Sequence, residues 1–189
     1  MRKTDLLGLS DEQLFELYGA GEALAGEVLL ARQRSGIYMF FARKVPAADA
    51  DELTQKVLEV LMRAPQRSEP LRSSVRGFAF GVARMLLRNY CSKKANGRSF
   101  DPELDSLVAL EPSLSRQLSQ RNRLDWLSTT IEELPVETQI LLDLRYGQNL
   151  GYREIAAIYG EPEPTLRRRM QAVKAKRLAK RQCYEKAGS

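Results

Sequence analysis

The sequence predicts an all-α protein of two small helical domains joined by an acidic linker, with a helix-turn-helix in the second domain. Apolar residues recur at helical spacing along most of the chain, and no segment shows the sustained alternation of a strand. Residues 99–115 carry four acidic residues, two prolines and no basic residue. Residues 134–181 have the pattern of a helix, a tight turn and a strongly basic helix. The predicted boundaries place the first domain at 1–98, the linker at 99–116 and the second domain at 117–189.

The first domain is predicted to begin with a capped helix. Ser10 and Gln13 have the spacing of a capping box, and a glycine-rich break at 19–21 ends the helix that follows them. Proline lacks the amide hydrogen that a helix interior needs, so Pro46 and a proline-bounded loop at 65–70 separate the later elements. Longer helices are therefore expected at residues 22–44, 47–63 and 72–94.

The second domain is predicted to contain a helix-turn-helix. A helical pattern opens at Leu134 and runs to Tyr146, and a short break follows at 147–149. A second pattern starts at 151 and stops at Gly160, which is a typical residue for a helix end. Such a pair of helices can place the next helix in a DNA major groove.

The third helical pattern of this domain, which starts at Pro162, is heavily basic. Between Pro164 and Arg181 there are eight Lys or Arg and no Asp or Glu, whereas the net charge of the whole chain is only +6. A basic block on one element indicates a docking face for DNA phosphates, and the first turns of such a helix supply base recognition. The alternative is a solvated amphipathic helix with ordinary surface charge, which does not explain why motif and charge coincide. The residues predicted to contact DNA are Thr165, Arg167, Arg168, Arg169, Gln171 and Lys174.

The predicted helix at 72–94 mixes basic and aromatic residues. Cations can hold a nucleic-acid backbone, and exposed rings can stack on unpaired bases. The rings also fall at core spacing, so packing is the competing interpretation and the basic residues are the better evidence. The predicted contact residues of this helix are Arg72, Arg76, Phe80, Arg84 and Arg88.

A polar cluster occupies the first turns of the predicted helix at 47–63. It consists of Asp49, Asp51, Glu52 and Gln55. Acidic residues there favour the helix dipole, whereas a functional interpretation makes them a face for a protein partner. The residues alone leave both interpretations open.

The composition argues against several classes of protein. The chain has no histidine, which removes histidine bases, Ser-His triads and histidine-containing metal sites. No glycine-rich phosphate loop or paired acidic motif is present, so we predict no catalytic residue, no cofactor and no metal site. No apolar run approaches the roughly 20 residues of a transmembrane helix. With no signal-peptide pattern at the N-terminus, and with Cys91 and Cys183 expected as reduced thiols, the chain is predicted to be cytoplasmic.

Taken together, these segments resemble the extracytoplasmic-function (group IV) sigma factors of bacterial RNA polymerase over nearly the whole chain. Residues 49–57 are similar to region 2.2 of that family, and residues 78–84 to regions 2.3 to 2.4. The segments similar to region 4 are Leu134-Pro135, Leu144-Arg145-Tyr146, Tyr152-Arg153-Glu154-Ile155-Ala156 and Gly160-Glu161-Pro162. The chain departs from the family pattern at Met85, Asn89, Gly151, Pro164 and Arg168, which bears on promoter preference.

The resemblance implies a promoter-specificity subunit without catalytic activity of its own. The cluster from Asp49 to Gln55 would bind the clamp helices of the polymerase β′ subunit, and the loop and helix at 68–94 would open and hold the −10 promoter element. The linker would thread toward the active-site cleft, and the basic helix from Pro164 would recognise the −35 element. Further implied partners are the polymerase β flap and an anti-sigma factor or other regulator.

Two other functions remain open at this point. The first is a stand-alone helix-turn-helix repressor or activator, whose first domain would dimerise or bind a ligand. The second is an enzyme acting on nucleic acid, which the lack of histidine and of an acidic metal cluster disfavours. Promoter-specific transcription with core polymerase distinguishes a sigma factor from both.

Overall fold

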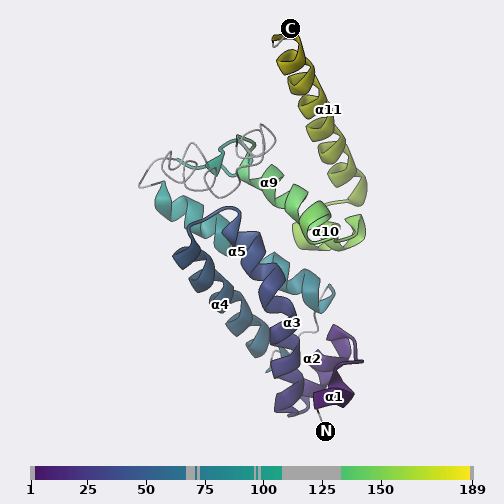
Figure 1. Ribbon diagram of the computed structural model, residues 1–189. Coiled ribbons are helices and arrows are strands. Elements are labelled where there is room, and N and C mark those ends of the chain that lie inside the picture. Colours follow the sequence, from purple (N-terminus) through teal and green to yellow (C-terminus); the bar gives the residue numbers. More distant parts are fainter. Residues whose placement is uncertain are drawn as a thin grey trace. The chain divides into compact units, whose positions relative to one another are not determined.

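The computed structural model describes residues 3–66, 71, 73–95, 97, 99–107 and 133–187, with side-chain surroundings described as far as residue 175. Its contacts divide the chain into two units, Met1–Ser99 and Phe100–Ser189. Among the described residues every regular element is a helix (Figure 1), as the sequence predicts. None of these helices is long and apolar enough to cross a membrane.

Three long helices that lie side by side form most of the first unit (Figure 1). Shorter helices pack against them near the N-terminus. The elements are α1 (Lys3–Leu6), α2 (Asp11–Gly19), α3 (Ala23–Ala42), α4 (Ala47–Arg63), a 3-10 turn (Ala64–Gln66) and α5 (Val75–Lys94).

Local capping signals set two of the helix starts. At α2 the predicted capping box is present: Gln13 N donates to Ser10 Oγ at 3.2 Å, and Ser10 N donates to Gln13 Oε1 at 2.9 Å. At α5 the Oγ of Ser74 accepts from Gly77 N at 3.0 Å, so the helix begins at Val75. The predicted start at residue 72 is therefore too early, and Arg72 itself lies outside the described residues.

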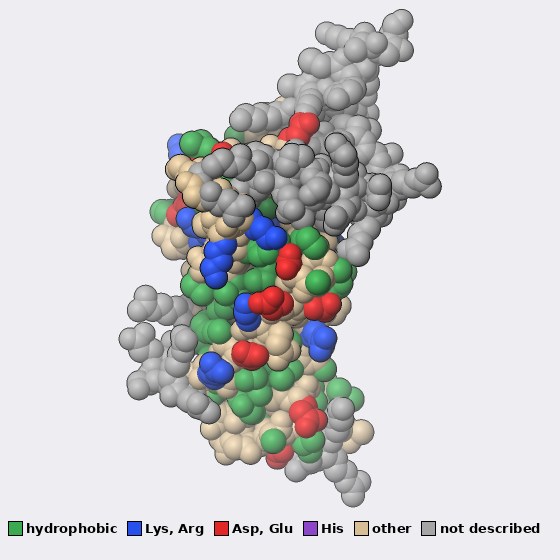
Figure 2. All heavy atoms as spheres, turned by 90° about the vertical axis from the view of Figure 1, so that its left-hand side faces the viewer, with side chains coloured by type: hydrophobic (Ala, Val, Ile, Leu, Met, Phe, Trp, Pro, Cys, Tyr) green, Lys and Arg blue, Asp and Glu red, His purple; other side chains and the backbone are tan. Residues whose placement is uncertain are grey.

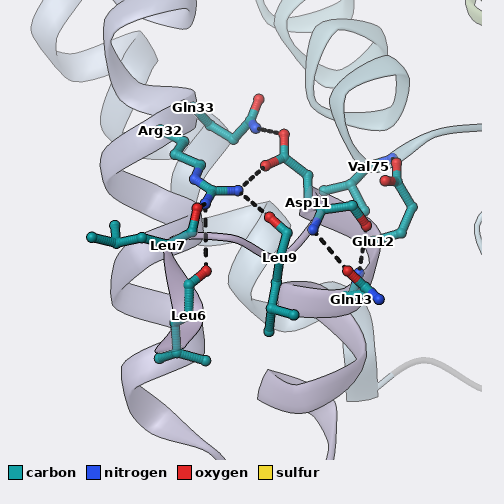
Figure 3. A network of polar contacts seen from close by, with 10 residues as sticks. Leu6, Leu7, Leu9, Asp11, Glu12, Gln13, Arg32, Gln33 and Val75 are labelled. Atoms are coloured by element: carbon teal, nitrogen blue, oxygen red, sulfur yellow. Dashed lines mark hydrogen bonds and ion pairs between the residues drawn. The ribbon is translucent and has the colours of Figure 1, made fainter. Parts of the chain in front are cut away.

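A polar network around Arg32 joins α1, α2 and α3 (Figure 3). The Arg32 guanidinium donates to the carbonyls of Leu7 and Leu9 at 2.7 Å, where α1 has ended and its backbone acceptors lack helical partners. It also pairs with Asp11 at 3.2 Å. Gln33 donates to the other Asp11 oxygen, so two neighbours on α3 hold the first turn of α2.

Aromatic rings fill the centre of the first unit. Phe40 and Phe41 of α3 meet edge to face at 5.2 Å between centroids, and Phe40 meets Phe80 of α5 at 5.8 Å. Phe40 and Phe41 are fully buried, and Phe80 is 1% exposed. Edge-to-face pairs add to the free energy already gained by removing these rings from water.

The second unit consists of α9 (Val136–Leu142), a π-helical turn (Asp143–Gly147), α10 (Tyr152–Tyr159) and α11 (Glu163–Ala187), together with residues 100–107. Residues 100–107 do not form a free tether. Val136 N donates to Asp105 O at 2.9 Å, Glu137 N donates to Pro102 O at 3.0 Å, and Leu107 is buried. The predicted linker therefore differs from the structure at its start, and residues 108–132 lie outside the described part.

Candidate nucleic-acid interface

A turn between two helices of the second unit positions the basic helix. Gly160 ends α10 with φ 66°, a left-handed conformation that suits glycine, and its N–H donates to Ala156 O. Pro162 then accepts from Thr165 N at 3.0 Å, which opens α11. Helix α11 thus starts where the sequence predicts, immediately after a tight turn.

The loop before α10 is closed by a π-helical turn. Gln148 N donates to Asp143 O at 2.8 Å, and Leu150 N donates to Leu144 O at 2.9 Å. Asn149 has φ 55°, which asparagine tolerates better than most residues. The predicted break at 147–149 is therefore a defined turn.

Capping of α10 suggests a stability test. Gly151 is its N-cap, with φ −70° and ψ 154°, and its N–H donates to Glu154 Oε2 at 2.9 Å. A Cβ added there would meet that oxygen at 3.5 Å, an ordinary contact. A serine hydroxyl would cap an amide of the first turn and restrict the unfolded chain, so Gly151→Ser should stabilise the second unit by about 0.5–1 kcal/mol. Hydrogen exchange of the α10 amides measures this.

The same substitution at the other end of α10 provides the control. Gly160 has the positive φ that a side chain disfavours, so Gly160→Ser should destabilise the unit by about 1 kcal/mol. Opposite signs for the two variants are expected. Equal signs would contradict the assignment of Gly151 as an improvable cap.

Helix α11 packs its apolar face on α9 and α10, and its basic face is exposed to solvent. Leu166, Met170 and Val173 recur at spacings of four and three residues and are all buried. The exposed positions next to them include Arg167, Arg168, Gln171 and Lys174, all predicted DNA contacts, whereas Thr165 is half-buried at the start of the helix.

The predicted contact residues of α11 differ in their surroundings. Arg168 and Gln171 are exposed, and their side chains have no hydrogen bond or ion pair with the described residues. Arg169 pairs with Glu161 at 3.3 Å and with Glu103 at 3.7 Å. Arg169 therefore holds the segment around Glu103, and the turn between α10 and α11, against α11 through these ion pairs. The sequence did not indicate these ion pairs.

Aromatic rings flank the remaining cations of this face. The Lys174 Nζ lies 5.7 Å from the centre of the Tyr146 ring, and a hydrogen bond with Tyr146 raises the pKa of Lys174. The Arg167 Cζ lies 4.4 Å from the centre of the Tyr152 ring. Both tyrosines belong to segments that resemble region 4, but the sequence predicts a contact role for neither.

One comparison with known proteins decides what this unit is. Residues 124–176 match the protein-family model described as Sigma-70, region 4, which spans α9, α10 and the exposed first turns of α11. The second unit contains a sigma-70 region 4 domain. None of the curated proteins matches the sequence. The predicted helix-turn-helix is thus confirmed, and the DNA contacts of individual residues stay predictions.

In the first unit, the predicted nucleic-acid contacts of α5 are only partly accessible. Phe80 is buried, so its ring is not available for stacking on a base, and the packing interpretation holds for this residue. Arg76 is half-buried, with its Cζ 5.8 Å from the centre of the Phe80 ring. Arg84 and Arg88 are half-buried on the same helix.

The polar cluster of α4 splits into an exposed part and a bonded part. Asp51, Glu52 and Gln55 are exposed, and a hydrogen bond and ion pair with Lys56 lower the pKa of Glu52. Asp49 is half-buried and accepts a hydrogen bond from the Tyr90 hydroxyl of α5 at 2.7 Å. On the side where α4 lies in Figure 1, acidic and basic side chains lie among hydrophobic ones (Figure 2). No group of acidic and sulfur ligands suited to a metal occurs among the described residues.

Proposed function

We propose that this chain is a sigma factor of the extracytoplasmic-function type, which binds core RNA polymerase and directs it to promoters. The observation that carries the proposal is the match of residues 124–176 to region 4, in a domain whose basic helix α11 presents Arg167, Arg168 and Gln171 to solvent. A cationic, partly unpaired helix face is what phosphate and base contacts require. The polymerase supplies the chemistry, and the protein works in the cytoplasm.

The proposal assigns different tasks to the two units. Helix α11 recognises the −35 element, and the region 4 domain also contacts the β flap. Asp51, Glu52 and Gln55 bind the β′ clamp helices, with Asp49 supporting the α4–α5 contact through Tyr90. Arg76, Arg84 and Arg88 hold the −10 element as it opens, and an anti-sigma factor or other regulator controls the protein.

Run-off transcription tests the proposal directly. Core polymerase would be mixed with the purified chain and genomic fragments, and new transcripts would be mapped. Promoter-specific transcripts that require the chain are expected. Specific duplex binding without polymerase and without new transcripts would instead identify a stand-alone repressor or activator, and modified nucleic acid in the absence of polymerase would identify an enzyme.

Base recognition by α11 has a specific expected result. The double variant Arg167→Ala, Arg168→Ala should lose about 2 kcal/mol of promoter discrimination, roughly thirtyfold, because the loss of one bidentate guanine contact falls in this range. Competition between the mapped promoter and a scrambled −35 element measures the change. Unchanged promoter choice and strength would contradict the assignment of α11.

Promoter opening should depend on α5. Charge-removing variants of Arg76 and Arg84 should slow opening by about tenfold while closed complexes persist, because cations on this helix are proposed to hold the unpaired strand. Permanganate footprinting of thymines, alongside gel-shift affinity, separates the two steps. A premelted bubble should rescue these variants; loss of closed complexes without such rescue would make α5 structural or a general DNA clamp.

A further inference from the structure

The guanidinium of Arg167 is held on two sides, unlike its neighbour Arg168. Its Nε donates to Glu163 Oε1 at 2.9 Å, and its Nη2 donates to the same oxygen. Its Cζ stands 4.4 Å from the centre of the Tyr152 ring. Yet the Arg167 side chain is 57% exposed, so the group is oriented while it remains accessible.

The ring that supports Arg167 is supported in turn. Arg145 approaches Tyr152 with its Cζ 5.1 Å from the ring centre. The Arg145 guanidinium is fixed by a hydrogen bond from Nη1 to Leu150 O at 2.9 Å, in the turn before α10. Tyr152 is therefore held by the turn before α10, through Arg145. Its ring in turn contacts Arg167, so the turn and the recognition helix α11 are linked through this tyrosine.

The contacts leave the donors that a base contact needs. A guanidinium has five N–H donors in a planar fork. Glu163 takes one from Nε and one from Nη2, so both hydrogens of Nη1 and one of Nη2 have no partner among the described residues. An end-on fork of this kind matches the O6 and N7 acceptors of guanine in the major groove.

We infer that Glu163 and Tyr152 are positioning residues that orient Arg167 to recognise one guanine in the −35 element. Arg168, which has no such support, provides a contact that tolerates any sequence. The inference rests on the proposed function of the region 4 domain and adds the residues that determine specificity. Orientation before binding increases discrimination because less side-chain freedom is lost in the correct complex.

The test is a selection of −35 sequences by holoenzyme assembled from core polymerase and the full chain, with the promoter otherwise constant. In the wild-type selection one guanine should be enriched, and Arg167→Ala should lose that preference by roughly thirtyfold. Glu163→Gln and Tyr152→Leu should each lose about threefold to tenfold at the same position and nowhere else. Tyr152→Phe, which keeps the ring, should restore the preference. Tyr38→Leu, at a half-buried tyrosine of α3 outside the region 4 domain, is the matched control.

Glu163→Gln also separates positioning from simple structural damage. It removes a negative charge beside the DNA, so total affinity for duplex should rise while discrimination at the guanine falls. A folding defect would lower both. Circular dichroism checks that Tyr152→Leu is folded, and Glu163→Gln decides the matter if it is not.

The outcomes distinguish this inference from the function on which it depends. If the wild-type holoenzyme enriches a −35 sequence but Glu163→Gln and Tyr152→Leu keep its full preference, the positioning role is wrong and the sigma-factor proposal stands. If Arg167→Ala also keeps the preference, another side chain recognises the base. If the wild-type holoenzyme enriches no sequence, the proposed function fails first.

Discussion

Replacing Phe40 by alanine should destabilise the first unit by about 3–5 kcal/mol while the region 4 domain keeps its fold. Phe40 is fully buried and contacts both Phe41 and Phe80, and the Lys44 Nζ lies 4.0 Å from the centre of its ring. Truncation would leave a cavity at the point where α3 meets α5. It would also leave the buried Lys44 without its aromatic neighbour, although Lys44 still donates to Phe40 O at 2.8 Å.

Hydrogen exchange followed by mass spectrometry measures this effect in each unit separately, which a single melting curve cannot do. Protection in α3, α4 and α5 should fall together, and protection in α9 and α10 should not change. Met39→Ala is the matched control, because Met39 is 43% exposed on the same helix and should change stability by less than about 0.5 kcal/mol. Equal losses for Phe40→Ala and Met39→Ala would contradict the description of this core.

The parts of the fold that were predictable from sequence depend on neighbouring residues. The capping box at Ser10, the extent of α4 at Ala47–Arg63 and the stop at Gly160 all match the structure, because each follows from contacts within a few positions. The predicted start of α5 at residue 72 is too early: Ser73 and Ser74 are both candidate caps, and it is Ser74 that caps the helix. The local sequence identifies residues that could cap a helix, and tertiary packing determines which of them does so.

The parts that were missed depend on contacts between distant residues. The segment around Pro102 has the composition of a linker, yet its backbone accepts hydrogen bonds from the start of α9. Phe80 combines core spacing with cationic neighbours, and only its burial decides between packing and stacking.

The candidate site was likewise only partly predictable. Glu163 and Arg167 stand four apart, a spacing that indicates an ion pair on a helix. The approach of Tyr152 to Arg167 crosses a turn between two helices, so periodicity could not reveal it.

Reversing two charges on α4 should reduce the affinity for core polymerase by roughly a hundredfold, because like charges placed against a basic partner surface are strongly unfavourable in an interface. The variant is Asp51→Lys, Glu52→Lys. Both side chains are exposed, and neither is part of the core of the first unit. Glu52 already pairs with Lys56, so its reversal also places two cations one helical turn apart. Circular dichroism must therefore show that α4 survives before binding is compared.

A control of equal charge separates a specific interface from a general change in net charge. Asp51→Lys, Glu52→Lys adds two units at each position, which takes the net charge from +6 to +10. Glu16→Lys, Glu27→Lys makes the same change at exposed positions of α2 and α3. Surface plasmon resonance on immobilised core polymerase should show a much faster dissociation for the α4 variant alone. If a folded α4 variant binds core like the wild type, the polymerase face lies elsewhere; if both variants lose affinity equally, the effect is one of overall charge and the acidic cluster serves the helix dipole alone.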